Sequence, residues 1–134
     1  MLAIDTITSA IIGDAIAVHR EFGPGLLEST YEACLTRLLS RRGLLVERQV
    51  PMPLIFQGES IDCAYRLDLF VERRVVVELK TVAKLEPVHF AQMMTYLTLS
   101  ESEVGLLINF NVVRLTDGLR RVVRGYRERA SQTS

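Results

Sequence analysis

The sequence predicts a mixed α/β or α+β protein in which helices flank a central β-sheet. Two amphipathic segments at the amino-terminal end indicate helices, and four short β-rich segments in the middle of the chain indicate strands. Another helical segment and further strand-like residues follow them. The chain has 134 residues, of which 49% are hydrophobic and 24% charged, and this composition suits one folded domain over residues 1–134.

The first two helices are predicted from apolar residues at helical spacing over residues 4–22 and about 26–42. The sequence Phe-Gly-Pro-Gly at 22–25 separates them, because Gly and Pro interrupt helices. Gly43 is a natural residue immediately after the end of the second helix. The two segments together predict a helical hairpin.

The middle of the chain alternates short β-rich segments with Pro, Gly or charged residues. These segments predict strands at Leu44–Val50, Met52–Phe56, Tyr65–Val71 and Val75–Lys80, with a turn at 57–60. Pro87 is well placed at the first position of a third helix, which continues to about Leu99. Residues 103–110 and 112–115 predict two final strands, and the arginine-rich tail predicts a short helix.

Charged residues interrupt the most apolar of these strands. Alternate residues of a strand face the same side, so Glu78 and Lys80 share one face. If the preceding turn is centred on Arg73, Asp68 lies directly opposite Glu78. A two-residue turn would pair Asp68 with Val77 instead, but such a turn favours Asn or Gly, and neither is present. We therefore predict an odd-length loop or a bulge that brings Asp68 and Glu78 together.

Two adjacent carboxylates repel each other unless a cation lies between them or one of them takes a proton. Oxygen ligands without His or Cys suit Mg²⁺ or Mn²⁺ rather than zinc. A lysine beside such an ion, here Lys80, could orient an attacking water or stabilise charge on a phosphate. Spacing alone leaves an alternative equally open, in which Asp68, Glu78 and Lys80 form a solvated, salt-bridged sheet face.

The same residues carry a family resemblance. Asp68 followed by Glu78-Leu79-Lys80 resembles the D…(D/E)xK core of the PD-(D/E)xK nuclease superfamily, although Leu67 stands where the superfamily often has proline. The resemblance implies a restriction-endonuclease-like core of αβββαβ topology around a central mixed sheet. It also implies that Asp68, Glu78 and the Leu79 carbonyl bind a metal ion, and that Lys80 is the catalytic lysine near the scissile phosphate.

A second motif lies in the predicted helical hairpin. Gly25, Glu28 and Tyr31 have the spacing that names the GxxExxY family, and the chain is similar to that family from about residue 11 to residue 123. By this resemblance Glu28 is an additional acidic site residue supplied by the helix. The alternatives are structural roles: Glu28 would occupy the first turn of the helix, where acidic residues are favoured, and Tyr31 would pack in the core.

The third predicted helix carries a polar stripe of His89, Gln92 and Tyr96. Gln92 and Tyr96 resemble a QxxxY element that follows the ExK motif in several nuclease families, where the Gln faces the active site. His89 is either a hydrogen-bond donor behind the site or an ordinary surface histidine.

The segment 114–129 carries six arginines and two acidic residues. It supplies the candidate phosphate contacts, which are Arg114, Arg120, Arg121 and Arg124. The alternative is a solvated terminal helix. Because the chain has 16 basic and 16 acidic residues, it is not expected to coat nucleic acid by net charge alone.

The combined expectation is a Mg²⁺-dependent nuclease, with Mn²⁺ as a substitute, acting on DNA or another nucleic acid. The alternative is a non-catalytic nucleic-acid-binding or regulatory protein-interaction module on the same fold. A homodimer through the apolar strands and the helix bearing Met93 and Met94 is compatible with both. The chain shows no signal-peptide pattern and no apolar run of membrane-spanning length, so we expect a cytoplasmic protein without a membrane partner.

Overall fold

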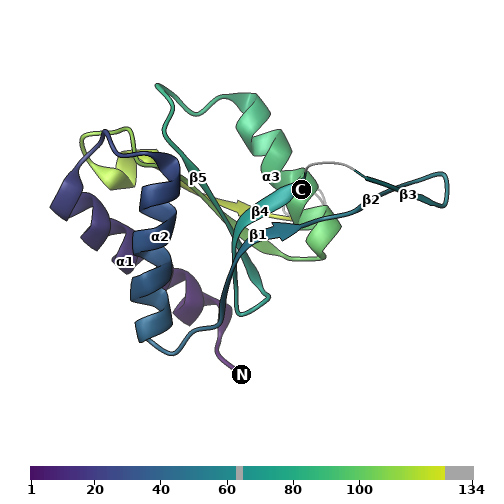
Figure 1. The fold of residues 1–134 in the computed structure, drawn as a ribbon, viewed down its shortest axis with the longest axis horizontal. Helices are drawn as coiled ribbons and strands as arrows, with labels where there is room; N and C mark the ends of the chain where they lie inside the picture. Colours follow the sequence, from purple (N-terminus) through teal and green to yellow (C-terminus); the bar gives the residue numbers. More distant parts are fainter. Residues whose placement is uncertain (63–64, 126–134) are drawn as a thin grey trace, which may run out of the picture.

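The computed structural model describes residues 1–62 and 65–125 (Figure 1). The chain begins with two helices, α1 (Ile4–Phe22) and α2 (Glu28–Arg41). The turn between them contains Gly25 at φ 115°, which favours glycine. The Tyr31 hydroxyl closes this turn, since it donates a hydrogen bond to the Gly23 carbonyl and accepts one from the Leu26 N–H at 3.1 Å. The predicted helical hairpin is confirmed, with α2 beginning two residues later than expected.

Within the described residues, five strands form one mixed sheet. In spatial order they are β1 (Val46–Pro51), β4 (Arg66–Val71), β5 (Val75–Lys80), β6 (Val104–Asn109) and β7 (Leu119–Val123). The β5–β6 pair is parallel, and the other neighbouring pairs are antiparallel. Helix α3 (Pro87–Ser100) connects β5 to β6. The sequence of α2, β1, β4, β5, α3 and β6 therefore confirms the αβββαβ order, and β7 extends it.

Helices cover both faces of the sheet, α1 and α2 on one side and α3 on the other (Figure 1). On the first face, Ile11 packs in a buried cluster with Val77 and Leu79. On the second face, Met93 packs in another cluster with Val76. The face of β5 that carries Glu78 is therefore also covered, by α3.

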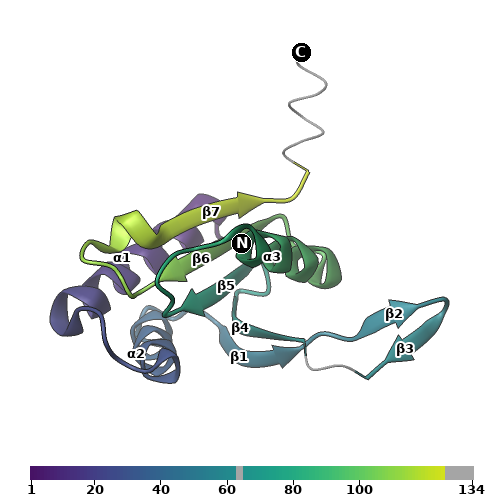
Figure 2. The same cartoon turned by 90° about the horizontal axis from the view of Figure 1, so that it is seen from above.

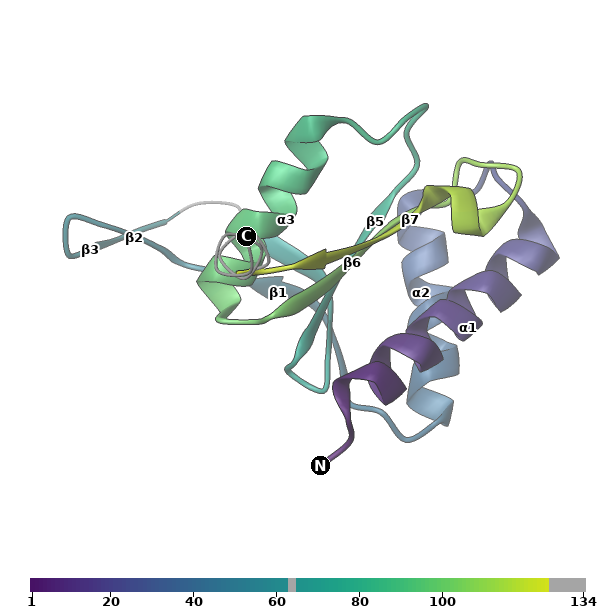
Figure 3. The same ribbon diagram turned by 180° about the vertical axis from the view of Figure 1, so that it is seen from behind.

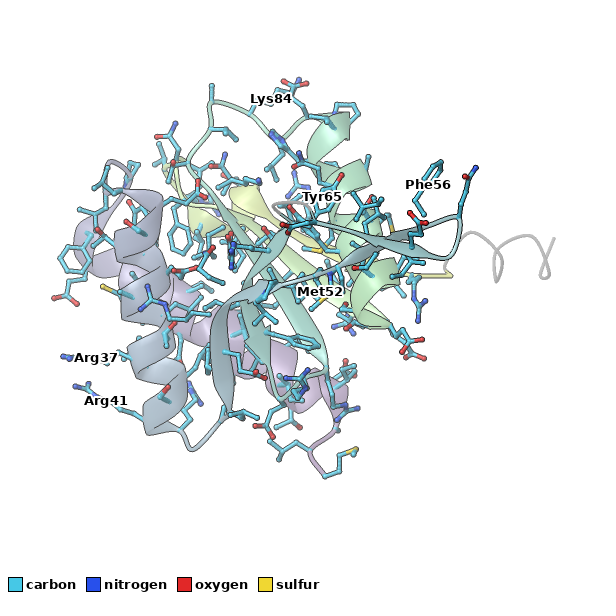
Figure 4. All side chains as sticks on the ribbon, turned by 45° about the vertical axis from the view of Figure 1, so that its right-hand side comes forward. Arg37, Arg41, Met52, Phe56, Tyr65 and Lys84 are labelled. Atoms are coloured by element: carbon cyan, nitrogen blue, oxygen red, sulfur yellow. The ribbon has the colours of Figure 1, made fainter. Side chains whose placement is uncertain are left out.

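A two-stranded hairpin follows the last residue of β1 and precedes the first residue of β4, and it projects away from α1 and α2 (Figures 1 and 2). It consists of β2 (Leu54–Phe56) and β3 (Glu59–Ile61). Ile55 and Phe56 are 61% and 60% exposed, and Phe56 stands out from this arm in Figure 4. The predicted turn is shorter than expected, because Glu59 already begins a strand that the sequence did not predict.

The carboxyl-terminal predictions need correction. Residues 112–115 are not a strand; a 3₁₀ turn, η1 (Leu115–Gly118), leads into β7, and both lie beside α1 (Figure 3). A Cβ at Gly118 would come within 2.3 Å of the Asn109 carbonyl oxygen, so only glycine permits this close approach of η1 to the end of β6. The expected terminal helix is absent from residues 119–123, and residues 126–134 lie outside the described residues. None of the helices described has the length and apolarity needed to span a membrane.

Candidate metal centre

The β4–β5 hairpin has the register that the sequence predicts. Leu69 pairs with Val77, and a three-residue turn, 72–74, connects the strands. Glu72 and Arg73 adopt φ values of 54° and 50°, which close the odd-length turn without glycine. Extended by one residue, this register places Asp68 opposite Glu78. The predicted turn geometry is therefore confirmed.

The carboxylates of Asp68 and Glu78 take over the bonding between β4 and β5 where the backbone pairing ends. The Asp68 N–H donates to Glu78 Oε1 at 3.1 Å, and the Leu79 N–H donates to Asp68 Oδ2 at 2.8 Å. Each side chain thus satisfies a backbone donor on the opposite strand. This exchange fixes both carboxylates side by side between the two strands.

Burial raises the pKa of Glu78 from its ordinary value of 4.5 to about 9, and the nearby charge of Asp68 contributes in the same direction. Lys80 lowers it, but less strongly. Glu78 is only 4% exposed, and no ion pair within residues 1–62 and 65–125 joins Lys80 to a carboxylate. The alternative of a solvated, salt-bridged sheet face is therefore wrong.

Glu28 enters the site from the first residue of α2. It lines a pocket of about 380 Å³ together with Asp68 and Leu79. Burial raises the pKa of Glu28, and the charge of Asp68 raises it further, whereas Lys80 and hydrogen bonds from Thr81 lower it. Glu28 thus lies close enough to Asp68 and Lys80 for both charges to shift its pKa.

Helix α3 approaches the carboxylates with Tyr96. The pKa of Tyr96 is raised by burial and then by the charges of Glu78 and Asp68. Its ring meets the edge of Tyr65, with ring centroids 6.1 Å apart. Gln92 lies one turn earlier on α3 and is exposed.

His89 closes the first turn of α3. Its backbone N–H bonds the Glu86 side chain, and the Glu86 N–H donates to His89 Nδ1 at 2.8 Å. This reciprocal capping accounts for the histidine at this position without a role in the site. Tyr31 is likewise structural, since it is fully buried and stacks on Phe110 at 4.2 Å.

The four candidate arginines do not form one surface. Arg121 pairs with Asp5 of α1 at 3.1 Å, and the Arg120 guanidinium bonds the carbonyls of Asp117 and Leu119. Arg114 is exposed in the preceding loop. Their positions along the sheet also differ, because Arg120 pairs near the carboxyl end of β6, the same end of the sheet as Lys80. Arg124 lies at the opposite end, where its N–H bonds the Glu103 carbonyl.

The residues that line the pocket also include Glu32 and Gln49, which were not predicted from the sequence. Glu32 is 5% exposed and pairs with Arg48 at 2.9 Å. The Gln49 amide donates to Glu32 Oε1 at 2.7 Å and to Asp68 Oδ1 at 3.3 Å. A sequence signal exists for Glu32, which follows Glu28 by four residues on the same helix face. Gln49 offers none.

The chemistry of these groups fits a divalent cation. Asp68 and Glu78 present adjacent carboxylate oxygens, and burial and the Asp68 charge raise the pKa of Glu78, which a nearby cation would lower. Within the described part of the chain, however, no three His, Cys, Asp or Glu side chains are gathered closely enough to form a metal site. The fit therefore rests on the two carboxylates of Asp68 and Glu78, with Glu28 lining the same pocket as Asp68.

A mixed sheet in αβββαβ order, with an Asp and an ExK motif meeting where two of its strands part, defines the restriction-endonuclease-like class of proteins. The family model described as the PD-(D/E)XK nuclease superfamily matches residues 5–122, and the chain belongs to this superfamily. No curated protein and no solved structure matches the chain.

Proposed function

We propose that the protein is a metal-dependent nuclease that hydrolyses phosphodiester bonds of nucleic acid, with DNA as the expected substrate. The observation that carries this proposal is the placement of Asp68 and Glu78 side by side, with Lys80 on the next residue of the same face. Membership of the nuclease superfamily supports the reaction class. We further propose the GxxExxY type, on the spacing of Gly25, Glu28 and Tyr31.

The proposed cofactor is Mg²⁺ or Mn²⁺, bound by Asp68, Glu78 and the Leu79 carbonyl, with Glu28 contributing from α2. A bound divalent ion supplies Lewis-acid stabilisation of phosphate charge and lowers the pKa of a water molecule. The Lys80 ammonium would bind a phosphate oxygen or orient the attacking water. Gln92 would contact substrate from the α3 side of the site.

Substrate phosphates would meet Arg114 and Arg120, because Arg120 lies at the same end of the sheet as Lys80 and Arg114 precedes it in an exposed loop. Arg121 and Arg124 are weaker candidates, since the first is paired with Asp5 and the second lies at the far end of β7. Because so few cations would contact phosphates, the affinity for nucleic acid should decrease only moderately as the salt concentration rises.

Cleavage assays with single- and double-stranded DNA and RNA test the proposal. We expect cleavage in Mg²⁺ or Mn²⁺ and none in chelator, with D68A, E78A and K80A each losing about 100-fold or more. Lys84 is the only other lysine and lies in the loop before α3 (Figure 4), so K84A is the matched control and should retain activity. Unchanged cleavage in the three variants would overturn the assignment of catalysis to Asp68, Glu78 and Lys80. Nucleic acid binding without cleavage or metal affinity would favour the non-catalytic module instead.

A further inference from the structure

Gln49 interrupts β1 at one position. Its φ of 51° lies in the left-handed region, which is uncommon for a residue other than glycine and often marks a functional constraint. On either side of it β1 pairs regularly with β4, Arg48 with Leu69 and Val50 with Leu67. The break in pairing thus falls where Gln49 faces Asp68.

The distorted backbone places the Gln49 amide between two carboxylates. The Nε2 group donates one hydrogen bond to Glu32 Oε1 at 2.7 Å and one to Asp68 Oδ1 at 3.3 Å. A primary amide has two N–H donors, so one group can serve both acceptors. Arg48 bonds the other oxygen of Glu32 at 2.9 Å, and this ion pair fixes the far end of the chain of contacts.

We propose that Gln49 is a positioning residue that fixes the orientation of the Asp68 carboxylate for cation binding. Asp68 Oδ1 is bonded by Gln49, and Asp68 Oδ2 is bonded by the Leu79 N–H at 2.8 Å. With a donor on each oxygen the carboxylate cannot rotate freely, and its remaining lone pairs stay available for a cation. The inference rests on the proposed function for its purpose, but the restraint on Asp68 can be tested without metal or substrate.

The test uses three variants. Q49A removes the amide, and Q49G removes it while relieving the left-handed backbone, so that only the lost amide is common to both. Q57A is the matched control, because Gln57 also has a φ of 51° but lies in the exposed turn of the β2–β3 hairpin. All three are compared with the wild type in the absence of nucleic acid.

The first measurement is hydrogen exchange at the Leu79 amide, relative to the Val77 amide in the same strand. We expect Leu79 to exchange about tenfold faster in Q49A and Q49G, because Asp68 then loses its fixed orientation, and at the wild-type rate in Q57A. The ratio of the Leu79 rate to the Val77 rate corrects for any change in global stability, because such a change would speed exchange at both amides. Unchanged Leu79 exchange in both Gln49 variants would overturn the inference.

The second measurement is Mn²⁺ affinity by calorimetry. We expect about 10- to 100-fold weaker binding in Q49A and Q49G than in the wild type and Q57A. Wild-type affinity in both Gln49 variants would overturn the link to cation binding. If the wild type binds no Mn²⁺ and cleaves nothing while Leu79 exchange still rises, the proposed function fails and the restraint of Asp68 by Gln49 stands.

Discussion

At the scale of single residues, Glu78 makes folding sensitive to pH. Its pKa is raised to about 9 in the folded protein, so the folded state keeps a proton that the unfolded chain releases above about pH 4.5. The folded state therefore binds more protons than the unfolded state in this window, and the free energy of unfolding decreases as the pH rises. Glu28 acts in the same direction, because its pKa is also raised.

We expect the metal-free protein to lose a few kcal/mol of unfolding free energy between about pH 5 and pH 8, since each pKa unit contributes about 1.4 kcal/mol. Urea unfolding at several pH values measures this loss. The E78Q variant cannot titrate at this position, so its loss should be clearly smaller. An identical pH dependence in the two proteins would contradict the assignment to Glu78.

Tyr31 permits a second prediction at this scale. Y31F retains the stacking on Phe110 but removes the hydroxyl that bonds Gly23 and Leu26. We expect a decrease of about 1–3 kcal/mol in unfolding free energy, because the part-buried Gly23 carbonyl and Leu26 N–H lose their partner. Y65F is the control, since Tyr65 is 37% exposed, and should change stability by less than about 0.5 kcal/mol. Equal effects of the two substitutions would show that the α1–α2 turn does not depend on the hydroxyl.

At the scale of secondary structure, local sequence predicted the β4–β5 hairpin well. No Asn or Gly stood at its centre, so a two-residue turn was excluded, and the longer turn fixed the partner of Asp68. The kink at Gln49 could not be predicted, because it depends on Glu32 and Asp68, which are distant in sequence. The 3₁₀ turn after β6 was also not predicted, because it depends on the close contact between Gly118 and Asn109, which only the folded structure shows.

The β2–β3 arm gives a prediction at the same scale. Ile55 and Phe56 make up much of its apolar surface and are largely exposed, so they contribute little to the core. We expect F56S to change the unfolding free energy by less than about 0.5 kcal/mol and to reduce self-association, because an exposed apolar strand favours it. L69S is the contrasting core variant and should destabilise strongly, since Leu69 is fully buried. A large loss of stability in F56S would mean that the arm is covered in solution.

At the scale of the whole molecule, the proposed metal binding would be coupled to folding. A ligand that binds only the folded state stabilises it, by about 2.7 kcal/mol when its free concentration is 100 times Kd. We expect Mn²⁺ to raise the thermal midpoint of the wild type. The midpoint of D68A should not change on addition of Mn²⁺, because D68A lacks one of the two adjacent carboxylates. Calorimetric or spectroscopic melting in Mn²⁺ and in chelator checks this. An equal shift in D68A would place the ion elsewhere.

The exchange of backbone bonds for carboxylate bonds between β4 and β5 has an evolutionary consequence. At Asp68 and Glu78 stability and the proposed reactivity conflict, because burial and the adjacent charge of Asp68 raise the pKa of Glu78, although each carboxylate also accepts a bond from a backbone N–H. Under the proposed function, natural selection would therefore have to act continuously to retain both acids. In a lineage released from that selection, these two positions should be among the first to drift, while the surrounding valines and leucines persist.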